Sequence, residues 1–230
     1  MGAIRDVFHA FLVEGATFEG EYEFARIWGT DAVPQSLIPF DIAIKSERHF
    51  DSWIHFYRHD YKFECLWQDP QAYLPILKKF PGVISPDFSK YRNMPLWQQI
   101  EAQGKTQALG YWLEKNGIPV IPNVRWGDER TYDFCFDGIS KYKTVAIGSL
   151  GCFKNRIERE YFRLGLAAML DRLCPERILV YGRAPEKIFA PIRADGIEVI
   201  SHCCYYESSR TKESTKTGTP HFIDSEVIKN

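Results

Sequence analysis

The chain has 230 residues, of which 45% are hydrophobic and 15% aromatic, enough for one domain with a substantial core. Its 29 basic and 30 acidic residues leave a formal net charge of -1, which gives no overall attraction to nucleic acid, so that a nucleic-acid partner would need a local basic patch. No apolar run approaches the roughly 20 residues of a membrane span, and no signal sequence is evident. We therefore expect a cytoplasmic protein without a membrane partner; the oligomeric state stays open.

The first 50 residues read as an arm. Partial alternation of apolar and polar residues around the turn at Gly15 predicts an N-terminal hairpin, and Pro34 and Pro39 predict a loop-rich stretch after it. At the other end, ESSRTKESTKTGTP has almost no apolar content and is predicted to be disordered. The chain thus divides into an arm at 1–50, an α/β domain at 51–206 and a tail at 207–230.

Short apolar runs alternate with helical segments across the middle of the chain. Helix starts are marked by Asp69-Pro70 and by Asn155 with Glu158 three residues on. This alternation predicts an α/β fold with a mostly parallel sheet of about six strands and crossover helices, either open and doubly wound or incomplete and barrel-like. The strands are predicted at 53–57, 82–86, 118–125, 144–147, 177–181 and 197–201.

The stretch from Gly82 to Glu129 forms one strand–helix–strand unit, closed after the helix by Asn116-Gly117. A right-handed crossover places the ends of both strands at the same edge of the sheet, where ligands of parallel α/β folds bind. The polar residues that follow the two strands should therefore lie together. They are Asp87, Ser89, Asn123, Arg125, Trp126 and Asp128.

Two of these residues suggest chemistry. Asp87 follows a proline at a strand end, where a carboxylate can act as a base or nucleophile, with an Asx-turn or helix-cap role as the alternative. Arg125 can hold a phosphate or carboxylate in its planar fork, beside a stacking face on Trp126. An ion pair of Arg125 with Asp87 or Asp128 that only braces the loop is the competing interpretation.

A second turn, at Gly148-Ser149-Leu150-Gly151, lies between a strand and a helix, where backbone N–H groups can hold an anion. Ser149 and Gly151 are therefore candidates for ligand binding, and Tyr181 would add a hydroxyl at the same edge; a tight turn is the alternative. His55 sits in an aromatic strand and is either a site member or a core histidine.

The cysteines suggest no metal site. No two of the six stand as CxxC, and the cluster at 202–204 lies on a predicted strand, where neighbouring side chains point to opposite faces. The chain also lacks the GxSxG, HExxH, P-loop and dinucleotide-binding patterns. We predict no metal ligand and no cofactor.

Four blocks of the chain, HFYRHDYKFE, GVISPDFSKYRNMP, GIPVIPNVRWGDERTYDFCFDG and ILVYG, resemble a bacterial and phage family, the domain-of-unknown-function family numbered 4417. The likeness runs from about Val7 to Ile200. It implies a prokaryotic or mobile-element origin and carries no known activity. It also implies a recurrent polar set: Asp87, Ser89, Tyr91, Arg92, Gln98, Asn123, Arg125, Trp126, Asp128 and Glu129.

The leading hypothesis is an enzyme that hydrolyses, or transfers a group from, a nucleotide, nucleoside or sugar-phosphate ligand. In it Asp87 is the base or nucleophile, Asp128 its partner carboxylate, Arg125 the anion clamp and Trp126 the stacking platform, with Ser89, Tyr91, Arg92 and Asn123 around the ligand. The alternatives are a non-catalytic protein that binds a nucleotide signal, nucleic acid or host protein, and a scaffold whose polar residues only fix loops.

Overall fold

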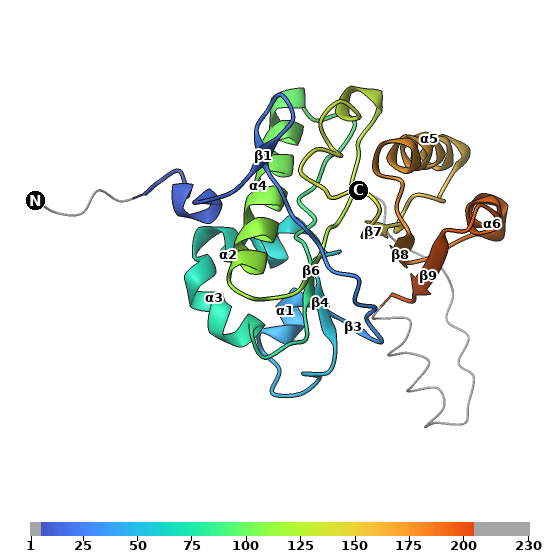
Figure 1. Ribbon diagram of the computed structural model, residues 1–230. Helices are drawn as coiled ribbons and strands as arrows, with labels where there is room; N and C mark the ends of the chain where they lie inside the picture. The colour runs from blue at the N-terminus through green and yellow to red at the C-terminus, as the bar shows by residue number, and fades with distance from the viewer. Residues whose placement is uncertain (1–5, 205–230) are drawn as a thin grey trace, which may run out of the picture.

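Two parallel sheets carry the fold of the computed structural model, which describes residues 6–204 (Figure 1). The strands of each sheet follow the order of the chain, β3-β4-β5-β6 in one and β7-β8-β9 in the other. The predicted disordered tail at 207–230 lies outside the described residues. The strands are β3 (Leu37–Pro39), β4 (Trp53–His55), β5 (Val83–Ile84), β6 (Val120–Ile121), β7 (Thr144–Gly148), β8 (Arg177–Tyr181) and β9 (Glu198–His202).

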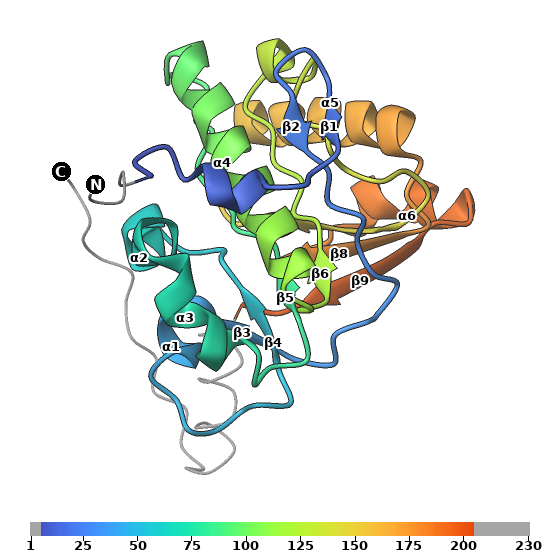
Figure 2. The same ribbon diagram turned by 60° about the vertical axis from the view of Figure 1, so that its left-hand side comes forward.

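Helices cover the outside of both sheets. Figure 1 shows α2, α3 and α4 around the four-stranded sheet and α5 and α6 beside the three-stranded sheet, and Figure 2 shows α4 lying across β5 and β6. Within residues 6–204, no helix is both long and apolar enough to cross a bilayer. The helices are α1 (Phe40–Ala43), α2 (Glu64–Gln68), α3 (Pro70–Leu77), α4 (Leu96–Lys115), α5 (Arg156–Leu173) and α6 (Glu186–Ala194), with short 3₁₀ turns η1 (Ala10–Val13), η2 (Asp60–Lys62) and η3 (Glu129–Thr131).

The two sheets are joined where the chain continues past β6. Asn123 pairs with Ala146 of β7 in a parallel bridge, and the Val124 amide donates to the Ala146 carbonyl at 2.8 Å. Every neighbouring pair from β3 to β9 is therefore parallel and in chain order. A doubly wound sheet reverses its strand order at a switch point, and no reversal occurs among the described strands.

The joined sheet is strongly curved. Tyr57, just past β4, stacks on Tyr181 at the end of β8, with ring centroids 4.9 Å apart and an interplanar angle of 12°. In a flat sheet these two strands, four positions apart, would be about 19 Å from each other. The curvature also brings β7 against Tyr57, since a Cβ added at Gly148 would lie 2.9 Å from the tyrosine ring. Of the two predicted architectures, the incomplete barrel-like one describes the fold.

Three clusters of apolar side chains fill the fold. One lies under α2, α3 and α4, a second under α5 and α6, and the third is enclosed by the curved sheet. The enclosed cluster draws on strands from both sheets, as the interior of a barrel does. Its buried members are Trp53, Tyr57, Ile84, Ile121, Ala146, Leu179 and Tyr181.

All six predicted parallel strands are present, and both predicted helix starts are confirmed. The Asp69 carboxylate accepts from the Ala72 amide at 3.1 Å at the start of α3, and Asn155 accepts from the Glu158 amide at 2.9 Å at the start of α5. The prediction of a loop around Pro39 was wrong, because β3 lies there. Proline is tolerated since, among the described strands, β3 pairs only with β4 and so forms an edge of the sheet.

The predicted N-terminal hairpin exists, but its turn lies elsewhere. β1 (Phe18–Glu19) pairs antiparallel with β2 (Phe24–Ala25), so the turn falls at Gly20 and not at Gly15. Gly20 adopts φ +78°, a left-handed conformation that glycine accepts without strain. The stretch before Gly15 forms the 3₁₀ turn η1 instead of a strand.

Candidate functional site

The ends of β5 and β6 meet at one edge of the sheet. Ser85 lies just past β5, and Asn123 lies just past β6. The Ser85 hydroxyl accepts a hydrogen bond of 2.8 Å from the backbone amide of Asn123. The contact joins residues 38 positions apart in the sequence. The polar residues that follow the two strands are thereby held side by side.

Asp87 is the centre of this edge. Its Oδ1 accepts from the Asn123 side-chain amide at 2.8 Å and its Oδ2 from Arg125 Nη1 at 2.6 Å. The Asp87 side chain is only 6% exposed, whereas that of Arg125 is 29% exposed. Burial opposes the charge of Arg125, but the Asp87 carboxylate outweighs it and the pKa of Arg125 is raised. The pair is thus a charged, largely desolvated unit.

Arg125 keeps hydrogen-bonding capacity beyond this pair. Among the described residues, the bond to Asp87 is the only one that its side chain makes. The guanidinium also lies 5.6 Å from the centroid of the Tyr91 ring, and Tyr91 is half exposed. A guanidinium has five N–H donors, so the remaining donors can take a phosphate or carboxylate from the solvent side.

Two buried polar atoms near this pair have no hydrogen-bond partner among residues 6–204. They are the hydroxyl of Tyr57 and Oδ1 of Asn123, in residues that are 7% and 4% exposed. Burial raises the pKa of the Tyr57 hydroxyl, and the charge of Asp87 raises it further, which places the ring close to the Asp87–Arg125 pair. Buried polar groups in native proteins are nearly always satisfied, so unpaired ones mark a place for a ligand or water.

Lys90 is a further candidate residue, buried three positions after Asp87, that the sequence interpretation did not single out. Its side chain belongs to the buried stretch 82–90 and the residue is only 3% exposed. Burial lowers its pKa to about 8, although Asp87, Cys135 and Asp60 favour its charge. The sequence could have indicated Lys90 through its position three residues after Asp87, in the loop that follows a buried strand.

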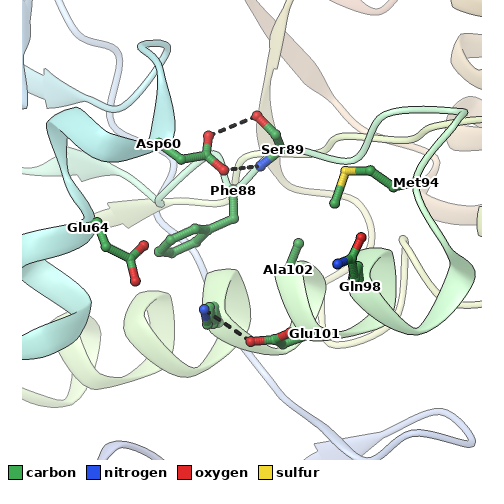
Figure 3. Close-up of a pocket in the computed structure, with 9 residues that line it drawn as sticks. Asp60, Glu64, Phe88, Ser89, Met94, Gln98, Glu101 and Ala102 are labelled. Atoms are coloured by element: carbon green, nitrogen blue, oxygen red, sulfur yellow. Dashed lines mark hydrogen bonds and ion pairs between the residues drawn. The ribbon is translucent and has the colours of Figure 1, made fainter.

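The loop after Asp87 is fixed by Asp60. The Asp60 carboxylate accepts from the Ser89 hydroxyl at 2.8 Å and from the Ser89 backbone amide at 3.1 Å, and the Ser89 hydroxyl in turn accepts from the Tyr91 hydroxyl at 3.2 Å. Ser89 and Tyr91 thus shape the loop. Beside them lies an open hollow of about 140 Å³, seen in Figure 3, which the predicted residue Gln98 helps to line. Its lining is Asp60, Glu64, Phe88, Ser89, Met94, Gln98, Glu101, Ala102 and Lys105.

Asp128 belongs to a different network from Asp87. Its carboxylate accepts from Arg130 Nε at 2.9 Å and from Nη2 at 2.8 Å, and caps η3 through the Arg130 amide. The hydrogen bonds from Arg130 hold the pKa of Asp128 below its ordinary value. The structure does not link the two carboxylates through a shared hydrogen-bond partner among the described residues.

Trp126 and Arg92 both pack toward α5. The Trp126 indole N–H donates to the Tyr161 carbonyl at 3.3 Å, and the ring lies so close to Gly165 that a Cβ there would be 2.1 Å from the indole nitrogen. Arg92 forms an ion pair with Glu158 and lies 4.1 Å from the centroid of the Tyr161 ring. These two residues brace the loops against the helix.

The predicted anion-binding turn is closed by its own contacts. The Ser149 hydroxyl donates to the Arg183 carbonyl at 2.8 Å, the Ser149 amide donates to the Tyr181 carbonyl at 3.0 Å, and Gly151 supplies a left-handed turn with φ +78°. Tyr181 stacks on Tyr57. In the part of the chain that the structure describes, no three His, Cys, Asp or Glu side chains are grouped so that they could hold a metal ion.

Comparison with known proteins connects the chain to bacteriophages. It is 36% identical over 175 residues to the Gene 1 protein of Mycobacterium phage L5, which covers 73% of this chain and 75% of that protein. It is 35% identical over 164 residues to the Gene 1 protein of Mycobacterium phage D29, covering 70% of this chain and 61% of that protein. No solved structure matches the chain. A family pattern matches residues 16–210, which confirms the resemblance found in the sequence: the chain belongs to the family described as Domain of unknown function (DUF4417).

Proposed function

We propose that this protein binds a small anionic ligand at the joined ends of β5 and β6 and acts on it by hydrolysis or group transfer. The ligand class is a nucleotide, nucleoside or sugar phosphate, met in the cytoplasm. The observation that carries the proposal is the Asp87–Asn123–Arg125 network, in which a buried carboxylate orients a guanidinium that is partly open to solvent. Its position is the one where parallel α/β folds bind ligands.

The geometry suggests a role for each residue. Arg125 binds the anionic group, because it keeps free donors on its exposed side. Asp87 positions Arg125 and Asn123, and it accepts a proton from the ligand only if the ligand displaces one of these two bonds. The unpaired Tyr57 hydroxyl and Asn123 oxygen would bind polar groups of the ligand. Asp128 and Trp126 have no role in the proposed chemistry and support the loops instead.

Nucleic acid is the less favoured partner. Such binding needs basic side chains that are free to meet phosphates. Two basic side chains near the site are already paired, Arg92 with Glu158 and Lys105 with Glu101. A protein that binds the anionic ligand without turning it over remains the alternative, and the experiment below separates it from an enzyme.

Thermal unfolding in the presence of nucleotides and sugar phosphates, at matched ionic strength, tests the proposal. A ligand at 100 times its Kd adds about 2.7 kcal/mol, which raises the Tm of a chain this size by about 5–10 °C. We expect this shift for the native protein and its loss in Arg125→Gln. Arg163→Gln is the matched control, because Arg163 lies on the exposed face of α5 and pairs only with Glu160 among the described residues.

Incubation of the best ligand with the protein, followed by chromatography of the products, then distinguishes the two classes. Product formation that is lost in Arg125→Gln supports an enzyme, and a Tm shift without product supports the non-catalytic alternative. A ligand that shifts the native protein and Arg125→Gln equally binds elsewhere, and that result would overturn the proposed site.

A further inference from the structure

Lys90 stands out as a buried cation without a counterion. No hydrogen bond or ion pair joins its ammonium group to another residue within 6–204, and the residue is only 3% exposed. Lysine is almost never fully buried unless it is paired. An unpaired lysine in this position costs stability, so a role at the neighbouring site is the economical explanation for it.

The acidic groups near Lys90 are already committed to other donors. The charges that act on it come from Asp87 and Asp60, which favour the ammonium, and from Arg125, which opposes it, together with the thiol of Cys135. Asp87 is bound by Asn123 and Arg125, and Asp60 is bound twice by Ser89. Both carboxylates are therefore close enough to influence the amine without neutralising it.

Cys135 is the other buried nucleophile near this site, and its thiol is unsuited to attack a substrate at neutral pH. Burial raises the pKa of its thiol to about 12, so the thiolate is scarce at neutral pH. Lys90 behaves in the opposite way, because burial lowers its pKa to about 8 and leaves about one molecule in ten with a neutral amine at pH 7. Desolvation of this kind is a standard way to activate a lysine nucleophile.

We infer that Lys90 is the nucleophile of the site and that its substrate is an anionic carbonyl compound, such as the open-chain form of a sugar phosphate. This inference rests on the proposed function, since Arg125 would hold the anionic group of that substrate. The Tyr57 hydroxyl, which has no partner in the described part of the chain, would donate a hydrogen bond to the carbonyl oxygen. The site would then be built for group transfer or bond cleavage through an imine.

The step balances without an added oxidant or reductant. The neutral amine nitrogen attacks the carbonyl carbon, and a nitrogen-bound proton moves to the carbonyl oxygen. The carbon–oxygen bond then breaks, and the oxygen leaves as water after taking one proton from solvent. A protonated imine between Lys90 and the substrate carbon remains.

Chemical trapping tests the inference directly. The full chain is incubated with ribose 5-phosphate and sodium cyanoborohydride, which reduces an imine to a stable secondary amine, and the modified lysine is located by peptide mass mapping. We expect modification of Lys90 to exceed that of any exposed lysine by about tenfold or more, with a rate that rises around pH 8. Ribose without the phosphate should react far less at Lys90.

Variants supply the controls. Lys90→Met should lose the specific adduct, and Lys187→Met, which changes an exposed lysine on α6, should keep it. No adduct at Lys90, or the same adducts in Lys90→Met, would overturn the inference. Thermal unfolding with ribitol 5-phosphate, which has no carbonyl group, and with the nucleotides of the screen separates this failure from a failure of the site. A shift that Arg125→Gln abolishes keeps the proposed function, and no shift with any of these ligands overturns both.

Discussion

Asp87 and Asp128 follow neighbouring strands, yet their hydrogen-bond partners come from different parts of the chain. Asp87 is buried and takes its partners from residues 36 and 38 positions away in the sequence. Asp128 binds Arg130, two residues further along the same turn. A parallel sheet brings distant strand ends together under cover of the fold, whereas a turn supplies only local, exposed partners. Both carboxylates are buried, but the side chain of Arg125 is 29% exposed and that of Arg130 is 45% exposed. The distant and more buried partners of Asp87 are thus what separates the candidate site from a braced loop.

Removing Asp87 should have the largest effect. In Asp87→Ala the guanidinium of Arg125 stays largely buried without its counterion, and the Asn123 amide loses its acceptor. We expect a loss of about 3 kcal/mol in the free energy of unfolding, measured by urea denaturation at pH 7. The double variant Asp87→Ala with Arg125→Gln should recover part of this loss, because the unpaired charge is gone. A loss below about 1 kcal/mol would mean that Arg125 is as well solvated as Arg130, the more exposed partner of Asp128.

Lys90 sharpens the comparison, because here a buried charge lacks a partner. Its folded pKa of about 8 lies below the ordinary value of 10.5, so the unfolded chain binds the proton more tightly. The resulting penalty, about 3 kcal/mol at pH 7, shrinks as the pH rises above 8 and is gone above 10.5.

Lys90→Met should therefore stabilise the protein at pH 7, and its advantage should vanish by about pH 10.5. Urea denaturation of both proteins across this range checks the prediction, with Lys187→Met as the exposed control. A variant that is less stable than the native protein at pH 7 would show that the amine has a stabilising partner.

His55 is a buried group that makes the stability of the protein depend on acid pH. It is fully buried, and burial, helped by the positive charges of Arg58 and His202, lowers its pKa to about 3. Between about pH 6.5 and 3, His55 is protonated in the unfolded chain but stays neutral in the native protein, so the free energy of unfolding falls as the pH falls. From pH 7 to pH 5 this amounts to about 2 kcal/mol.

The variant His55→Asn should make stability fall less steeply as the pH drops, because asparagine does not take up a proton. The variant should still fold, since its side-chain oxygen can accept the hydrogen bond that the Tyr57 backbone amide donates to His55 Nδ1 at 3.2 Å. His59→Asn, four residues along and exposed, is the matched control. An unchanged slope in His55→Asn would assign the acid sensitivity to other groups.

Local signals and the rule for parallel strands account for what the sequence predicted well. Asp69 and Asn155 act on backbone amides three residues away, so their caps can be read from spacing alone. The meeting of Asp87 with Arg125 follows from the crossover between two strands. These are properties of one segment or of one pair of segments.

The rest depends on the curvature of the whole sheet and on the path of single loops. Tyr57 meets Tyr181 only because strands four positions apart curl toward each other, which no pair of segments reveals. Lys90 is buried by the course of its loop, against the usual preference of lysine for solvent. Asp128 and Arg130 stand two residues apart in the sequence, but that spacing alone did not distinguish a closed local pair from a partner for Asp87.

Asp128 should show the smallest effect, and this is where the comparison can fail. Asp128→Asn keeps an oxygen to accept from the Arg130 amide, so the cap of η3 survives and only the ion pair is lost. We expect Tm to fall by less than about 2 °C at pH 7, because the Arg130 side chain is 45% exposed and an ion pair with one partner open to solvent contributes little. The native pKa of Asp128 lies below 3.8, so the native protein should lose this small advantage as the pH falls through that value. If Asp128→Asn instead matched Asp87→Ala in stability and abolished ligand binding, the two carboxylates would be equivalent, and the burial of their arginine partners would no longer explain which of them belongs to the site.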